Sequence, residues 1–153
     1  MATLLIGGNG LIGTRLVEYL CEKGEQVISF SLHSPARKVS GCVYVQGDVT
    51  EYGTLNMTLK QYSIDRVIHN AGISHPKMFR DNPYKIYRTN VGGVLTSLEA
   101  ARNYGVERYI YISSGAVYGN VHYERVNEDT PLHSENPYGA TKVACEELVR
   151  NYG

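Results

Sequence analysis

Short apolar runs alternate with helical patterns along the whole chain. The runs predict β-strands at residues 3–6, 26–30, 42–45, 66–69 and 108–112. Between them, apolar residues recur at helical spacing. The pattern predicts a helix through Ile12, Leu16, Val17 and Leu20, a short helix at Leu55 and Leu59, and longer helices at residues 84–104 and 137–152. Asn136 and Pro137 suit the N-cap and first position of the last helix.

This order of elements predicts an α/β fold. Alternating strands and helices are typical of a parallel sheet with helices on both faces, and right-handed crossovers then give a doubly wound, Rossmann-type sheet. A chain of 153 residues is expected to form one domain, residues 1–153. Such a sheet binds ligands beyond the carboxyl ends of its strands, where the strand order reverses.

Composition narrows the range of partners. The chain has 15 basic and 15 acidic residues and a formal net charge of zero, so a nucleic-acid partner is not expected. No apolar run is long enough to span a membrane, and the N-terminus does not resemble a secretory signal. The three cysteines form no CxxC pair, which favours a cytoplasmic setting, and the five histidines have no metal-ligand spacing, so no metal is expected.

A glycine-rich turn follows the first predicted strand. It runs from Gly7 through Gly10, Leu11 and Ile12 to Gly13, and opens the first helix. Glycines permit a tight turn and close approach of a pyrophosphate, while the helix N-terminus offers free N–H groups to the phosphates. The sequence therefore predicts a dinucleotide site here; the alternative is a tight turn that binds no ligand.

The end of the second strand bears on the choice between NAD and NADP. An acidic residue that would bind a ribose 2′-hydroxyl is absent, and Ser31 stands in its place, followed by Arg37 and Lys38. A hydroxyl and a cation suit a 2′-phosphate, so the sequence favours NADP over NAD. The alternative is that the two cations are solvated loop charges.

Two further strand ends supply candidate cofactor contacts. Asp48 and Val49 follow the third strand, where a carboxylate can accept from the adenine amino group or instead cap the following turn. Asn70, Ala71 and Gly72 follow the fourth strand, and their small size permits close approach of the cofactor.

Tyr138 and Lys142 carry the chemical signal of the last helix. Residues four apart lie on one helix face. A phenol is a poor base at neutral pH, but a nearby ammonium stabilises the phenolate, which can then accept a proton from a substrate hydroxyl. Ser113 and Ser114, at the end of the fifth strand, face the same crevice. Ser114 is predicted to bind the substrate oxygen, although serines also occur there as turn residues.

Together these motifs resemble those of extended short-chain dehydrogenases/reductases of the NAD-dependent epimerase/dehydratase family. The resemblance rests on the glycine turn, on Asp48-Val49, on Asn82-Pro83 with Tyr87 and Asn90-Val91, on the serines with Val117-Tyr118-Gly119, and on Asn136-Pro137-Tyr138-Gly139 with Lys142. It implies that Ser114, Tyr138 and Lys142 are catalytic, that Lys142 also holds the nicotinamide ribose, and that Asn90 supports the site. It also implies a homodimer formed through the two long helices.

Within that family, the stretch 114–117 resembles epimerases that act on nucleotide sugars. Gly115 and Ala116 stand where the 4,6-dehydratases carry an Asp-Glu pair, so elimination is disfavoured. The resemblance implies that the chain corresponds to an N-terminal half without its C-terminal substrate domain. A reductase of the same family and a non-catalytic NAD(P)-binding module remain alternatives.

Overall fold

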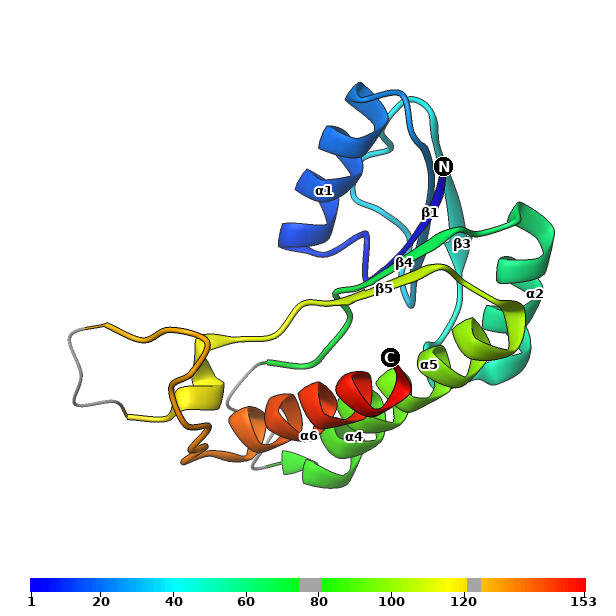
Figure 1. Ribbon diagram of the computed structural model, residues 1–153. Helices are drawn as coiled ribbons and strands as arrows, with labels where there is room; N and C mark the ends of the chain where they lie inside the picture. Colours follow the sequence, from blue (N-terminus) through cyan, green and yellow to red (C-terminus); the bar gives the residue numbers. More distant parts are fainter. Residues whose placement is uncertain (75–80, 121–124) are drawn as a thin grey trace.

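A five-stranded parallel sheet forms the centre of the computed structural model, which describes residues 1–74, 81–120 and 125–153 (Figure 1). The strands are β1 (Ala2–Ile6), β2 (Gln26–Ser31), β3 (Cys42–Gln46), β4 (Arg66–His69) and β5 (Arg108–Tyr111). Their order is β3-β2-β1-β4-β5, and each neighbouring pair is parallel. The predicted strands and the doubly wound α/β fold are therefore confirmed.

The helical segments also follow the predicted order. They are α1 (Leu11–Glu22), α2 (Tyr52–Tyr62), α4 (Pro83–Tyr87), the π-helical turn η1 (Arg88–Gly92), α5 (Gly93–Tyr104), the 3-10 turn η2 (Gly115–Tyr118) and α6 (Pro137–Tyr152). The helix predicted at residues 84–104 is thus interrupted by a π turn, which the helical spacing alone did not indicate.

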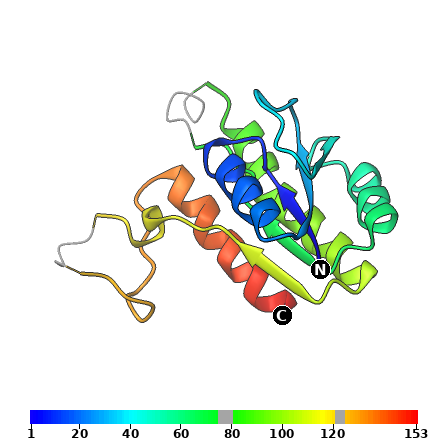
Figure 2. The same cartoon turned by 90° about the horizontal axis from the view of Figure 1, so that it is seen from above.

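Helices cover both faces of the sheet, as Figures 1 and 2 show. On one face, Val17 and Leu20 of α1 pack against Leu5, Val27 and Ile68. The opposite face is covered by α2 and α5, and α6 packs beside α5 against β5. Because successive strand residues point to opposite faces, both layers draw on the same short strands, which explains their almost continuous apolar runs.

The strand order reverses at β1. From β1 the chain moves to β2 and β3 on one side, and then returns to β4 and β5 on the other. The segments that follow β1 and β4 are joined where the strands end, since the backbone N–H of Asn70 donates to the carbonyl of Ile6 at 2.8 Å. This carboxyl edge is where ligands of such sheets bind.

Within the described ranges, no helix is both long enough and apolar enough to cross a membrane.

Candidate active site

A cavity of about 390 Å³ opens at this carboxyl edge. The turn after β1, the segments after β4 and β5, and the first turns of α6 all contribute to its wall. It is lined by Gly7, Gly10, Leu11, Ile12, Asn70, Gly72, Ser74, Ile112, Ser113, Tyr138 and Lys142. The fold therefore brings the predicted glycine turn and the predicted tyrosine–lysine pair into one cavity.

Three of the four glycines in the turn, Gly7, Gly10 and Gly13, differ in the space around them. Gly7 has a φ of +82°, and a Cβ there would lie 2.6 Å from the backbone nitrogen of Ala71. A Cβ on Gly13 would lie 2.2 Å from the carbonyl oxygen of Gly7. Gly10 has an ordinary φ of −77°, and the nearest atom to its Cβ would be 3.4 Å away. Among these three, only Gly10 has room for a side chain within the protein, and it lines the open cavity, as close approach of a dinucleotide would require.

The N-terminus of α1 offers hydrogen-bond donors to this cavity. Gly10 is the N-cap and supplies no side-chain cap, and the first turn carries no acidic residue. Leu11, which is 90% exposed, and Ile12 line the cavity beside it. The first N–H groups of a helix lack intrahelical acceptors and carry a partial positive charge. This part of the cavity therefore fits the pyrophosphate of a dinucleotide.

Helix α6 begins where the sequence predicts. The side chain of Asn136 accepts from the backbone N–H of Gly139 at 2.8 Å, and Pro137 takes the first helical position. This cap sets the start of the helix, so Tyr138 and Lys142, one turn apart, both reach the cavity wall.

Lys142 is buried within that wall, with only 5% of the residue exposed. Its Nζ donates to the carbonyl oxygen of Ile112 at 2.8 Å and lies 4.6 Å from the ring centre of Tyr111 and 5.8 Å from that of Tyr138. Burial lowers the pKa of Lys142, and the neighbouring Cys145 and Glu146 oppose that effect. The ammonium is therefore held between two tyrosine rings, beside the predicted proton acceptor.

The two serines after β5 take different positions. Ser113 lines the cavity, and its hydroxyl donates to Oε1 of Glu146. Ser114 caps η2, where its Oγ accepts from the backbone N–H of Ala116 at 3.2 Å. Ser114 is not among the lining residues, and the turn role considered for it is the one that the structure shows. Its contact with a substrate oxygen stays a prediction.

Asn90 lies behind the cavity, at the π turn. Its Oδ1 accepts from the backbone N–H of Ile73 at 2.7 Å, and its Nδ2 donates at 3.1 Å to the carbonyl of Ile73 and to Oγ1 of Thr141. The amide thus ties the segment after β4 to α6, next to Lys142. This arrangement agrees with a supporting role, because the side chain is committed to protein partners.

The segment after β4 contributes more than the sequence indicated. Asn70 and Gly72 line the cavity, whereas Ala71 packs against the core and approaches Gly7. Ser74 also lines the cavity. No sequence signal singled out this serine, because a hydroxyl two residues beyond a small-residue turn is common in loops.

Asp48 and Val49 lie away from the cavity lining. Oδ1 of Asp48 accepts from both the backbone N–H and the hydroxyl of Thr50, each at 2.9 Å, which is the turn-capping alternative. Val49 is buried in the core against α5. Their contact with a cofactor stays a prediction.

Ser31 and Arg37, predicted to bind a 2′-phosphate, have partners within the protein. The buried hydroxyl of Ser31 accepts from the backbone N–H of Asn9 at 3.1 Å and so holds the glycine turn. Arg37 forms an ion pair with Glu18 of α1. Neither residue lines the cavity.

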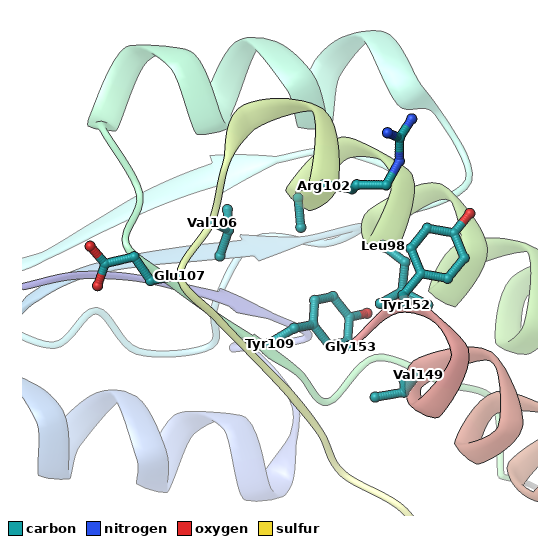
Figure 3. Close-up of a pocket in the computed structure, with 9 residues that line it drawn as sticks. Leu98, Arg102, Val106, Glu107, Tyr109, Val149, Tyr152 and Gly153 are labelled. Atoms are coloured by element: carbon teal, nitrogen blue, oxygen red, sulfur yellow. The ribbon is translucent and has the colours of Figure 1, made fainter.

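A second cavity, of about 410 Å³, lies at the other end of β5 (Figure 3). It is lined by Leu98, Ala101, Arg102, Val106, Glu107, Tyr109, Val149, Tyr152 and Gly153. Because it opens at the amino end of β5, it is remote from the glycine turn and from the predicted catalytic pair. The carboxyl edge is therefore the better candidate for the active site. Among the described residues, no cluster of three or more His, Cys, Asp or Glu could hold a metal ion.

His69, the last residue of β4, makes stability depend on pH. Its Nδ1 lies 2.9 Å from Oγ of Ser97 and 2.9 Å from the hydroxyl of Tyr109. Complete burial lowers the pKa of His69 to about 3, and the charge of Lys142 contributes. The unfolded chain therefore takes up a proton near pH 6.5 that the folded chain excludes.

We accordingly expect the free energy of unfolding to be greatest above pH 6.5 and to fall as the pH is lowered toward 3, by up to about 1.4 kcal/mol per pH unit from His69. Urea unfolding between pH 7 and about 5, above the usual carboxylate range, measures this slope. The variant His69→Gln should flatten it, whereas His33→Gln, at an exposed loop position, should not. Equal slopes in all three proteins would contradict the prediction.

Comparison with known proteins agrees with this geometry. The model of the NAD dependent epimerase/dehydratase family matches residues 3–153, nearly the whole chain. The chain belongs to this family. A UDP-glucose 4-epimerase of Lacticaseibacillus casei is 32% identical over 152 residues, which cover 97% of this chain and 46% of that protein. The chain thus spans about half the length of the curated relatives that it matches.

Solved structures of family members are also similar. A UDP-glucose 4-epimerase of Thermus thermophilus in complex with NAD has a TM-score of 0.93 and 32% identity, covering 100% of this chain and 51% of that one. The UDP-glucose 4-epimerase of Bifidobacterium longum, in complex with NAD⁺ and UDP, has a TM-score of 0.91 and 29% identity, covering 99% and 48%. The preference for NADP drawn from Ser31 and Arg37 has no support, since these structures hold NAD.

Proposed function

We propose that this family member binds NAD and supports reversible oxidation at a hydroxyl-bearing carbon of a nucleotide sugar, as an epimerase does. The observation that carries the proposal is the meeting of the glycine turn with Tyr138 and Lys142 in one cavity at the strand-order reversal. Neither motif alone is specific, but binding and proton transfer together require both in one place.

The chain's own residues would divide the work. Gly10 and the N-terminus of α1 would hold the pyrophosphate, and Lys142 the nicotinamide ribose. Tyr138 would accept the proton of the substrate hydroxyl, and the ammonium of Lys142 would stabilise the charge that develops on the phenolic oxygen. NAD, when bound, would supply a reversible hydride acceptor for that carbon, and return of the hydride to the other face of the oxidised carbon would invert it.

The relatives suggest the substrate class. The relatives are named UDP-glucose 4-epimerases, and one of the solved structures contains UDP. We therefore propose that the substrate is a nucleoside diphosphate sugar and that its C4 is inverted. Conversion of UDP-galactose to UDP-glucose in the presence of NAD would test this choice directly.

NAD binding can be tested on this chain without any turnover. A ligand at 100 times its Kd raises the free energy of unfolding by about 2.7 kcal/mol, which for this length shifts the Tm by roughly 5–10 °C. A melt with and without NAD should show such a shift. An unchanged Tm at high NAD would contradict the proposed function.

Gly10→Ala should weaken NAD binding and leave the fold intact. The added methyl group meets no protein atom closer than 3.4 Å, but it occupies the cavity beside the helix N-terminus. Steric overlap of one methyl group costs about 1–3 kcal/mol, so we expect the Kd for NAD to rise roughly 5- to 150-fold in calorimetric titration. Gly53→Ala, in open space on α2, is the matched control and should bind NAD as the unmodified chain does. Equal NAD affinities in the two variants would contradict the proposed position of the NAD phosphates beside Gly10.

We also propose a homodimer and a cytoplasmic location. Tyr84, Tyr87 and Leu95 expose apolar surface on α4 and α5 and lie within the first of the two helical segments, 84–104 and 138–152, through which the family resemblance implies pairing. The cysteines Cys21, Cys42 and Cys145 are all free thiols, which suits a reducing compartment.

A further inference from the structure

The segment after β5 is joined to α6 at two successive positions. The carbonyl of Ile112 accepts from Nζ of Lys142, and the hydroxyl of Ser113 donates to the carboxylate of Glu146. Lys142 and Glu146 are one helical turn apart, so they project from the same face of α6. Ile112, Ser113 and Lys142 line the cavity, whereas Glu146 is not among the lining residues.

We propose that Glu146 is a positioning residue of the candidate active site, which fixes the Ser113 hydroxyl and keeps the Lys142 ammonium charged. Its importance for turnover rests on the proposed function, but its contacts with the cavity wall do not. No sequence motif singled out Glu146; its signal was its place four residues beyond Lys142, on the face already assigned to the site.

The hydrogen bond to Glu146 determines what Ser113 can offer a ligand. A serine hydroxyl has one proton, and Ser113 gives it to the carboxylate. Toward the cavity the oxygen then presents lone pairs only. It therefore binds groups that donate, such as a sugar hydroxyl or an amide N–H, and not a phosphate oxygen.

The charge of Glu146 matters because Lys142 is buried. The titratable groups that face Lys142 are His69 of β4, Tyr111 of β5, and Tyr138, Cys145 and Glu146 of α6. Burial lowers the pKa of His69 and raises the pKa values of Tyr111 and Cys145, so these three groups are neutral at pH 7. Cys145 also raises the pKa of Lys142, but Glu146 is the carboxylate among these groups, and it offsets the positive charge of Lys142.

The experiment measures the pKa of Lys142 directly, by NMR of the chain with ¹³C-labelled lysine. The chain has six lysines, and the signal absent from Lys142→Arg identifies Lys142. We expect Glu146→Gln to lower the pKa of Lys142 by about one pH unit. Glu147→Gln makes the same chemical change one residue further on, at an exposed glutamate paired with Arg150, and should leave that pKa unchanged.

A third variant separates charge from shape. Glu146→Asp retains the charge but shortens the reach to Ser113, so Lys142 should keep nearly its original pKa. If Glu146→Gln does not fold, a fall of about one pH unit in the Lys142 pKa of Glu146→Asp would still contradict the proposal. An unchanged Lys142 pKa in Glu146→Gln, or an equal fall in Glu146→Asp, would overturn the proposal.

The same proteins separate this proposal from the proposed function. If NAD binds and turnover is observed, the alkaline limit of kcat should move to lower pH in Glu146→Gln and stay in place in Glu147→Gln. If NAD does not bind, the proposed function fails, while the fall in the Lys142 pKa still decides whether Glu146 holds the ammonium charged.

Discussion

Tyr138→Phe is expected to reduce turnover by a factor of about 10² to 10⁴ while NAD binding is almost unchanged. The substitution removes one phenolic oxygen from the cavity wall and keeps the ring against which Nζ of Lys142 lies, at 5.8 Å from the ring centre. The loss therefore falls on proton transfer, because no other group then takes the substrate proton at that position. Turnover is followed with UDP-galactose, and NAD affinity by calorimetry.

The chain supplies a matched control for this substitution. Tyr19 of α1 and Lys23, the C-cap of that helix, have the same four-residue spacing, and Nζ of Lys23 lies 5.5 Å from the ring centre of Tyr19. Tyr19 is 56% exposed and does not line the cavity. Tyr19→Phe should leave both turnover and NAD affinity as they are. Full activity in Tyr138→Phe would refute the role of Tyr138 as proton acceptor.

Gly13→Ala is expected to destabilise the fold by about 3 kcal/mol, which corresponds to a fall in Tm of roughly 6–12 °C. The new methyl carbon would lie 2.2 Å from the carbonyl oxygen of Gly7 and 2.7 Å from Cα of Gly8. Both are backbone atoms of the turn, so relief requires that α1 move away from β1. The loss of NAD binding would follow from the displaced helix.

Thermal unfolding without NAD provides the measurement for this prediction. Gly10→Ala, three residues earlier in the same turn, is the comparison, since its methyl group has room within the protein. We expect a large fall in Tm for Gly13→Ala and a small one for Gly10→Ala. Similar melting temperatures for the two variants would mean that the turn accommodates a side chain at Gly13.

Most of the fold follows from local pattern. The central strands β1 and β4 are short and mostly apolar because both of their faces are buried, and this is visible in the sequence as apolar runs. The start of α6 was equally predictable, because Asn136 caps the helix through a hydrogen bond to a residue only three positions further along the chain. The π turn at Asn90 was not predictable in this way, since it accompanies hydrogen bonds of Asn90 to Ile73 and Thr141, which are 17 and 51 residues away in the chain.

The candidate site was predicted in its main parts and missed in its details. Tyr138, Lys142 and Gly10 lie in the cavity as expected, because motif and topology point to the same edge. Ser31 and Arg37 were assigned to a 2′-phosphate because their chemistry suits one. In the fold, the hydroxyl of Ser31 accepts from the backbone N–H of Asn9, and Arg37 forms an ion pair with Glu18. A residue's hydrogen-bonding capacity is visible in a sequence, but the partner that takes it up is not.

The sequence by itself determined the parallel sheet, the glycine-rich turn and the family resemblance, because each strand and each motif consists of residues close together in the chain. It also contained two tyrosine–lysine pairs at the same spacing, Tyr19/Lys23 and Tyr138/Lys142. Only the tertiary structure decided how they differ. The first pair lies on the exposed surface of the protein at α1, and the second faces the carboxyl ends of β1 and β4. There Lys142 is buried and donates a hydrogen bond to the carbonyl of Ile112. Burial and charge balance at that edge arise from segments brought together across the whole chain, and these give the pair its chemistry.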